Sequence, residues 1–159
     1  SFGGKIAWKG FDLEVLFQGA AGMSVNILDN KNQVVAFVNN GNAYDIAKGA
    51  WAYYPEQGID TRATATYPRL TTQSNENNYQ TSSMWVKNAD YLKLRNLELG
   101  YNFNAMKLQR AGVDNLRVYL SAHNLLTFSG LLKHYNMDPE KISGYPTIKS
   151  YNVGVSITF

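Results

Sequence analysis

The chain has 159 residues, enough for one ordinary domain, and its 15 basic and 12 acidic residues give a net charge of +3. The basic residues form no block, which favours a mildly basic surface over nucleic-acid binding. Cysteine is absent, which excludes disulfides and cysteine-based zinc sites. Charged residues are only 17% of the chain, and the mean hydropathy of -0.32 leaves no run of about 20 apolar residues for a membrane helix.

Two strand-like runs open the chain, at residues 2–9 and 11–20, with Gly10 between them. Alternation of apolar and polar residues with a period of two predicts a strand with one face of each kind. A single glycine between two such runs predicts a tight hairpin. The apolar positions of the two runs are Phe2, Gly4, Ile6, Trp8, Phe11, Leu13, Val15 and Phe17.

The segment 21–85 is too long and varied for a plain connection, and it is rich in rings and in Asn, Gln, Ser and Thr. Loops of this length in compact proteins are usually functional. Residues 43–53 predict a short helix within it. Its rings are candidates for stacking on sugars or for contact with a partner protein; the alternative is packing within the loop or an interfacial aromatic girdle. These candidates are Trp51, Tyr53, Tyr54, Tyr67, Tyr79 and Trp85.

A third strand is predicted from Val86 to Phe103, with a change of phase inside it. Leucines at 92 and 94 lie in one phase, whereas the apolar residues at 97, 99, 101 and 103 lie in the other. One extra residue near Arg95 and Asn96 reconciles the two halves, which predicts a β-bulge there.

A fourth strand is predicted at residues 115–126 and a fifth from about residue 147 to Phe159. Strands of about ten residues, tilted by about 45°, span about 23 Å, close to the apolar band of about 25 Å in an outer-membrane barrel. In such a barrel the apolar faces meet lipid and the polar faces line the lumen. The lumen-facing candidates, which are expected to contact substrate or plug or to pair with one another, are Glu14, Glu98, Arg117, Tyr119 and His123.

The connections alternate between short ones, at Gly10 and 104–114, and long ones, at 21–85 and 127–146. Barrels of the outer membrane have short periplasmic turns and long extracellular loops. The predicted fold is therefore all-β: residues 1–159 form the C-terminal strands of a transmembrane antiparallel β-barrel, about five strands of a larger one. Because five strands cannot close a barrel and no signal peptide precedes Ser1, we expect a longer exported protein.

The sequence gives no support for a catalytic site or a metal site. His123 and His134 are the only histidines and have no acidic residue at ligand spacing, so no metal site is expected. Asp138 and Glu140 pair two carboxylates, but in a turn-like setting without a catalytic motif. Asn124 is interpreted as a turn former at a strand end. The sequence therefore predicts neither an enzyme nor a cofactor.

Five blocks of sequence, in their order and spacing, resemble the C-terminal region of SusC/RagA-like TonB-dependent outer-membrane transporters. They are residues 10–22, 67–70, 82–103, 116–129 and 145–159, and the most specific is SSMWVKNADYLKLRNLELGYNF at 82–103. The resemblance implies a barrel of about 22 strands around an N-terminal plug, in the outer membrane of a Gram-negative bacterium. It further implies import of glycans or peptides with a SusD-like lipoprotein, and energy from the TonB complex acting on the missing N-terminal part.

Two further expectations remain. The resemblance implies that Phe159, an aromatic residue on the expected lipid face, belongs to a signal for barrel assembly. The rival interpretation is a soluble, carbohydrate-binding β-sandwich that uses the loop aromatics, and it requires a second sheet to cover the apolar rows.

Overall fold

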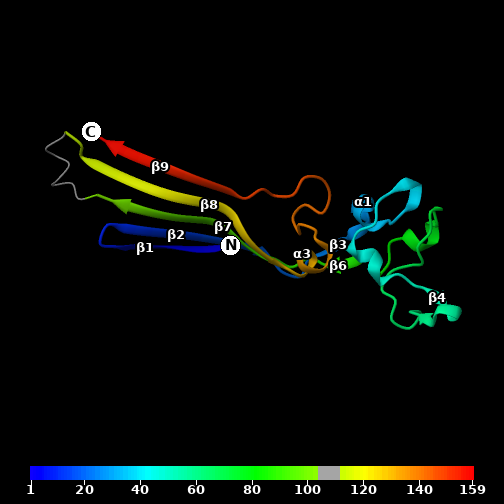
Figure 1. Cartoon of the computed structure of the whole chain (residues 1–159). Coiled ribbons are helices and arrows are strands. Elements are labelled where there is room, and N and C mark those ends of the chain that lie inside the picture. Colours follow the sequence, from blue (N-terminus) through cyan, green and yellow to red (C-terminus); the bar gives the residue numbers. More distant parts are fainter. Residues whose placement is uncertain (104–111) are drawn as a thin grey trace. The chain divides into compact units, whose positions relative to one another are not determined.

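The computed structural model describes residues 1–103 and 112–159, which form two compact units. The sheet unit comprises residues 1–20, 91–128 and 147–159, and the loop unit comprises residues 21–90 and 129–146. Five strands lie side by side in the sheet in the order β1-β2-β7-β8-β9 (Figure 1). Their bounds are Phe2–Trp8 for β1, Phe11–Ala20 for β2, Tyr91–Asn102 for β7, Asn115–Ser129 for β8 and Ser150–Thr158 for β9.

The predicted hairpin at the start of the chain is confirmed, and its turn has two residues. Lys9 and Gly10 connect β1 to β2, and both have positive φ, 47° and 91°. Two successive left-handed residues form a type I′ turn, whose twist matches that of the flanking strands. A Cβ on Gly10 would also lie 2.9 Å from the carbonyl oxygen of Asn102. Both the turn and the neighbouring strand therefore require glycine here.

The predicted β-bulge is confirmed at Arg95. Pairing between β2 and β7 passes from Leu16 opposite Asn96 to Phe17 opposite Leu94, so Arg95 has no opposite residue. The extra residue lets both halves of β7 present apolar side chains to one face, which is the reason the two phases in the sequence differ.

The prediction of a single strand from 86 to 103 is wrong, because the structure has two strands in this segment. The short strand β6, Val86–Asn88, pairs with β3, Ser24–Asn26, in the loop unit, and β7 begins only at Tyr91. Asp90 ends the first ladder: its backbone N–H donates to the Asn88 side chain at 2.7 Å, and its carboxylate accepts from the N–H of Met23 at 2.9 Å. This last bond lowers the pKa of Asp90. Short polar side chains that bond the backbone compete with a ladder in this way.

The fourth strand differs from its predicted bounds at one end, and the fifth differs at both, because β9 ends at Thr158 and not at Phe159. The strand β8 includes the predicted 115–126 and continues to Ser129, whereas β9 starts at Ser150 and not at about 147. The paired ladder ends where His123 faces Ser150, next to Asn124, which has a φ of 53°. The Asn124 amide donates to the Ile148 carbonyl at 3.1 Å, so a side chain takes the place of the next ladder bond. Asn124 therefore lies inside β8 but ends its pairing with β9.

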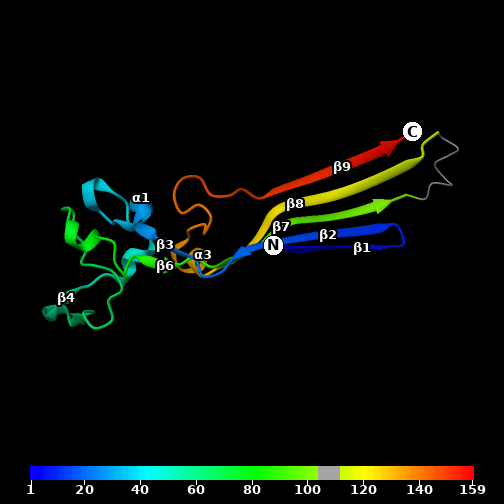
Figure 2. The same cartoon turned by 180° about the vertical axis from the view of Figure 1, so that it is seen from behind.

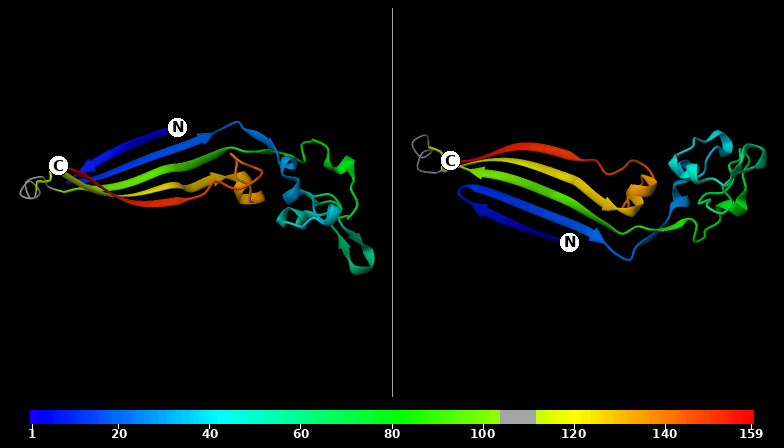
Figure 3. Two further views of the ribbon diagram at one scale, coloured as in Figure 1. Left: turned by 90° about the horizontal axis from the view of Figure 1, so that it is seen from above. Right: turned by 60° about the horizontal axis from the view of Figure 1, so that its bottom comes forward.

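The register gives the sheet one apolar and one polar face. Leu116 lies opposite Ile157, Val118 opposite Val155 and Leu120 opposite Val153, and paired residues share a face. The strands β1 (blue) and β9 (red) form the two edges (Figure 3). The short connection predicted at 104–114 lies mostly outside the described residues.

The loop unit is built from short elements (Figure 2). No helix in the described part of the chain is long and apolar enough to cross a membrane. The helix predicted at 43–53 is only a 3-10 helix at Asp45–Gly49, because the Gly49 carbonyl accepts the N–H groups of Thr66 and Tyr67. The other elements are 3-10 helices at Ile27–Asn30, Val38–Asn40, Pro55–Gln57 and Glu76–Tyr79, α1 at Lys31–Val34, β4 at Tyr53–Tyr54, β5 at Ile59–Asp60 and α3 at Gly130–Tyr135.

The core of the loop unit centres on Tyr67 and Trp85, whose rings meet edge to face at 5.8 Å. The Tyr67 hydroxyl donates to the Val34 carbonyl at 2.6 Å and accepts from the Ala36 N–H at 2.9 Å. A buried hydroxyl with both roles satisfied holds segments that are far apart in the chain.

We predict that Tyr67→Phe destabilises the loop unit by about 1–3 kcal/mol, because the buried Val34 carbonyl and Ala36 N–H lose their partner. Hydrogen exchange should show faster exchange at Ala36. Tyr44→Phe, at an exposed ring, is the control and should leave the Ala36 amide unchanged. Equal exchange at Ala36 in the Tyr67→Phe variant would contradict the prediction.

Candidate functional site

A charged cluster occupies the polar face of the sheet and links β2, β7 and β8. The Arg117 guanidinium contacts the Asp12 carboxylate at 2.5 Å and the Glu98 carboxylate at 2.7 Å. Asn102 donates a further hydrogen bond to Asp12 at 2.8 Å. The Asp12 side chain is only 5% exposed, so its charge depends on these partners. Arg117 therefore joins strands that are not neighbours in the sheet.

Two glycines let large side chains lie flat on this face. A Cβ on Gly100 would stand 2.5 Å from the Arg117 guanidinium and 2.7 Å from the Asp12 carboxylate. A Cβ on Gly154 would stand 2.3 Å from the Tyr119 ring. The Arg117 guanidinium in turn lies 5.0 Å from the centre of the Tyr119 ring. Sequence analysis missed Asp12, Gly100 and Gly154 as site residues; glycines at polar-face positions of predicted strands were the available signal.

The five lumen-facing candidates all lie on this one polar face. Glu14 is directly opposite Glu98 and also meets Lys5 at 3.8 Å. His123 shares a hydrogen bond of 2.9 Å with Asn96. The structure thus brings Glu98, Arg117 and Tyr119 together and leaves His123 and Glu14 in separate pairs. That this face lines a lumen stays a prediction.

A second polar cluster lies near the end of the sheet where the chain passes to the loop unit. Arg95, the bulge residue, donates to the Gln18 side chain at 2.8 Å and to the Asn124 side chain at 2.6 Å. Asn124 donates in turn to the Ile148 carbonyl. Each of these four residues lies within five positions of a boundary between the two units. The cluster therefore ties together all four segments that leave the sheet.

The six candidate rings of the loop differ in burial. Tyr67 and Trp85 are buried in the core, and Tyr79 packs beside Trp85 at 5.8 Å. Burial, together with the neighbouring Tyr67 hydroxyl, raises the pKa of Tyr79. These three rings pack within the loop, which was the alternative to partner contact. Trp51 is half-buried, and Arg69 lies 5.7 Å from its ring centre.

Tyr53 and Tyr54 are 44% and 50% exposed on a small hairpin of β4 and β5. Arg62 lies over the Tyr53 ring at 3.8 Å and donates two hydrogen bonds, at 2.8 and 2.9 Å, to Asp60. These bonds lower the pKa of Asp60 to about 2. The hairpin therefore holds Tyr53 in place and presents Tyr54 on its other face, beside Ile59. Contact of these two exposed rings with a partner or substrate stays a prediction.

The structure also bears on Phe159 and on metal sites. Phe159 directly follows β9 and is 82% exposed, and its role in assembly stays a prediction. Within residues 1–103 and 112–159, no group of three or more His, Asp or Glu side chains has the arrangement of a metal site.

Comparison with known proteins gives relatives of one kind. The chain is 24% identical over 175 residues to "TonB-dependent receptor P3" of Formosa agariphila and 26% identical over 174 residues to "TonB-dependent receptor P26" of the same organism. Each alignment covers 99% of this chain but only 16% of the relative. No family model matches the chain.

Comparison with solved structures gives matches to a transporter as well. The RagAB peptide transporter matches with a TM-score of 0.71 and 27% identity, and the RagAB peptide importer in the "closed-closed" state matches with 0.70 and 26%. Both matches cover 96% of this chain and 16% of the solved chain. The antiparallel sheet thus matches a fragment of the barrel in these structures, and the strands described here do not close a barrel. The predicted resemblance to a segment of SusC/RagA-like TonB-dependent transporters is confirmed by sequence and by fold.

We predict that Arg117→Met destabilises the sheet by about 3 kcal/mol, because it leaves the buried Asp12 charge without its main partner. Chemical unfolding of the purified protein measures the change. Lys5→Met is the control: its pair with Glu14 is exposed on both sides, so we expect a loss of less than about 1 kcal/mol. If the two variants unfold alike, the Arg117 cluster does not hold the sheet.

Proposed function

We propose that this chain is part of an outer-membrane transporter of a Gram-negative bacterium that imports oligosaccharides or peptides. The observation that carries the proposal is the sheet with one apolar and one polar face, together with the match of 96% of the chain to RagA-type structures. A transporter wall needs one side that suits lipid and one that suits water, and the apolar and polar faces of this sheet meet that need.

Exposure of the apolar face supports a lipid environment. Val153 is 75% exposed, and Val155, Leu120 and Ile157 are also exposed beside it. A continuous apolar patch of this kind is unfavourable in water, whereas acyl chains satisfy it. The outer edges of β1 and β9 need further strands, because unpaired backbone groups are too costly in lipid.

The β-sandwich interpretation has no support in the fold. A sandwich requires a second sheet whose inner face packs on the apolar rows. The sheet unit, as far as the structure describes it, contains one sheet only, and its apolar side chains are exposed.

Further parts of the proposal concern partners. The connections from β2 to β7 and from β8 to β9 leave the same end of the sheet, and both belong to the loop unit. Long connections mark the extracellular side of an outer-membrane barrel, so the loop unit would face a SusD-like lipoprotein there. Energy from the TonB complex would act on a plug and N-terminal segment outside these 159 residues.

The import proposal is tested with the full-length receptor in its own bacterium. Uptake of labelled oligosaccharides and peptides is measured in cells with intact tonB and in cells that lack it. We expect uptake of one of these classes to depend on both the receptor and TonB. Uptake that is unchanged when the receptor gene is deleted, across both classes, would overturn the proposal.

We predict that Val155→Arg lowers the stability of the barrel in lipid vesicles by about 2–4 kcal/mol if the residue lies near the bilayer midplane. Ser156→Arg, on the neighbouring polar-face position, should cost much less. Urea unfolding followed by tryptophan fluorescence compares them. A larger loss for Ser156→Arg would mean that the two faces are assigned the wrong way round.

Replacement of Trp51, Tyr53 and Tyr54 together by Ala should weaken co-purification of the SusD-like lipoprotein, because interfaces depend on a few large aromatic anchors. The barrel should still fold, since the three residues lie outside the buried core of the loop unit and loops tolerate change. Partner recovery at wild-type stoichiometry, with normal uptake, would count against the idea. Normal partner recovery with reduced uptake would assign the rings to substrate instead.

A further inference from the structure

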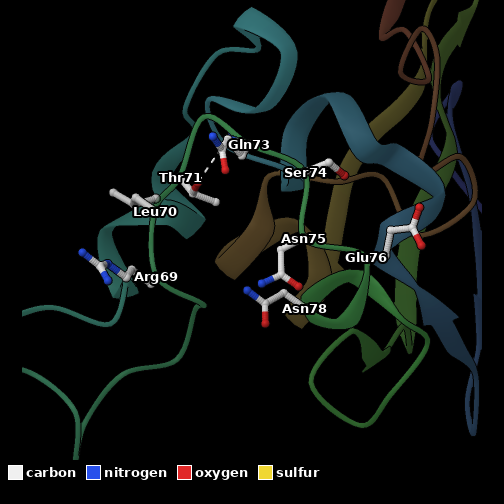
Figure 4. Close-up of a pocket in the computed structure, with 8 residues that line it drawn as sticks. All are labelled: Arg69, Leu70, Thr71, Gln73, Ser74, Asn75, Glu76 and Asn78. Atoms are coloured by element: carbon white, nitrogen blue, oxygen red, sulfur yellow. Dashed lines mark hydrogen bonds between the residues drawn. The ribbon is translucent and has the colours of Figure 1, made fainter.

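Two adjoining cavities in the loop unit form a polar cleft, which we call the amide cleft. The first has a volume of about 540 Å³ and is lined by residues 69–71, 73–76 and 78 (Figure 4). The second, of about 820 Å³, is lined mainly by residues between 31 and 44, together with Tyr79. Ser74 and Glu76 line both cavities, so the two share a wall. Volumes of this size are typical of ligand sites.

Seven side-chain amides line the cleft, and none has a hydrogen-bond partner in the described part of the protein. The amides of Asn75, which precedes the short 3-10 helix Glu76–Tyr79, and of Asn78, within that helix, point toward each other (Figure 4). Elsewhere in the loop unit, Asn26, Asn30 and Asn88 donate their side-chain amides to other side chains or to the backbone. The uncommitted amides of the cleft are those of Asn32, Asn39, Asn40, Asn42, Gln73, Asn75 and Asn78.

The walls that carry these amides are fixed by the core of the loop unit. The buried Trp85 side chain donates to the Asn78 carbonyl at 2.8 Å. The Tyr67 hydroxyl contacts the Tyr79 hydroxyl at 3.4 Å and also bonds Val34 and Ala36, which flank Val35 in the lining of the second cavity. One buried hydroxyl therefore connects both walls. Groups that are held in place before binding lose less entropy when a ligand arrives.

The chemistry of the lining selects the class of ligand. An amide both donates and accepts hydrogen bonds, as a sugar hydroxyl does. The only charged residues of the lining are Lys31, Arg69 and Glu76, so no cluster of cations is available for an anionic ligand. The exposed Tyr44 ring offers an apolar surface beside the amides. None of the lining residues belongs to a strand, so an extended peptide has no edge here to which it can add.

We propose that the amide cleft binds a neutral oligosaccharide. This inference rests on the proposed import function, whose substrate class it narrows. Asn75 and Asn78 hydrogen-bond the sugar hydroxyls, and Tyr67 is a positioning residue that acts through the two walls of the cleft.

The test uses the full-length receptor with its lipoprotein, purified in detergent, and calorimetric titration. The probes are neutral hexasaccharides of α-glucan, β-glucan, mannan and fructan type, and a set of hexapeptides with blocked ends. The double variant Asn75→Ala/Asn78→Ala should weaken binding of one hexasaccharide about tenfold, because two hydrogen bonds are lost. Asn77→Ala is the matched control: it lies on the same short helix as Asn78, lines neither cavity and should change affinity less than twofold. Tyr67→Phe should weaken binding to an intermediate degree.

The outcomes separate this inference from the import proposal. Binding of a hexapeptide that the double variant weakens would overturn the oligosaccharide assignment and leave import intact. Binding of a hexasaccharide that neither the double variant nor Tyr67→Phe affects would overturn the cleft as the site. An absence of hexasaccharide binding, with TonB-dependent uptake still present, would also overturn it. Only the uptake experiment can overturn the import proposal itself.

Discussion

The sheet depends on one charged contact, that of Arg117 with Asp12 and Glu98. Asp12 is nearly buried, and β7 lies between its strand and that of Arg117, so the contact joins three strands at one level. A slip of one residue in any pairing would move its partners to the apolar face, at the cost of a stranded charge. The exposed Lys5–Glu14 pair imposes no such constraint. The contact is possible only because Gly100 leaves the surface of β7 open beneath it.

The loop unit is organised by a different force, the burial of large rings. Trp85 and Tyr67 fill its core, and the Tyr67 hydroxyl satisfies backbone groups that no regular ladder reaches. Short elements with little regular hydrogen bonding need such a centre, because their own backbone groups remain unpaired otherwise. Tyr53, Tyr54 and the uncommitted amides are not part of this core, so they lie where a ligand or partner can reach them.

The two units meet through four chain segments, and the Arg95 cluster holds these segments where they leave the sheet. A bulge and a left-handed asparagine in adjoining strands are both less favourable than regular strand backbone. Their side chains recover part of that cost by bonding each other and their neighbours.

The sequence by itself determined the main features of the sheet: the period of two assigned the faces, a glycine marked the hairpin, and the change of leucine phase placed a bulge near Arg95 and Asn96. These features are local, because each follows from neighbouring residues. The sequence did not show that the ladder breaks at Asp90, whose side chain accepts a hydrogen bond from the backbone N–H of the distant Met23. It also did not show which loop rings are buried, or that Gly100 and Gly154 lie under Arg117 and Tyr119. Only the tertiary structure decided these points, because burial and cross-strand contact depend on residues far apart in the chain.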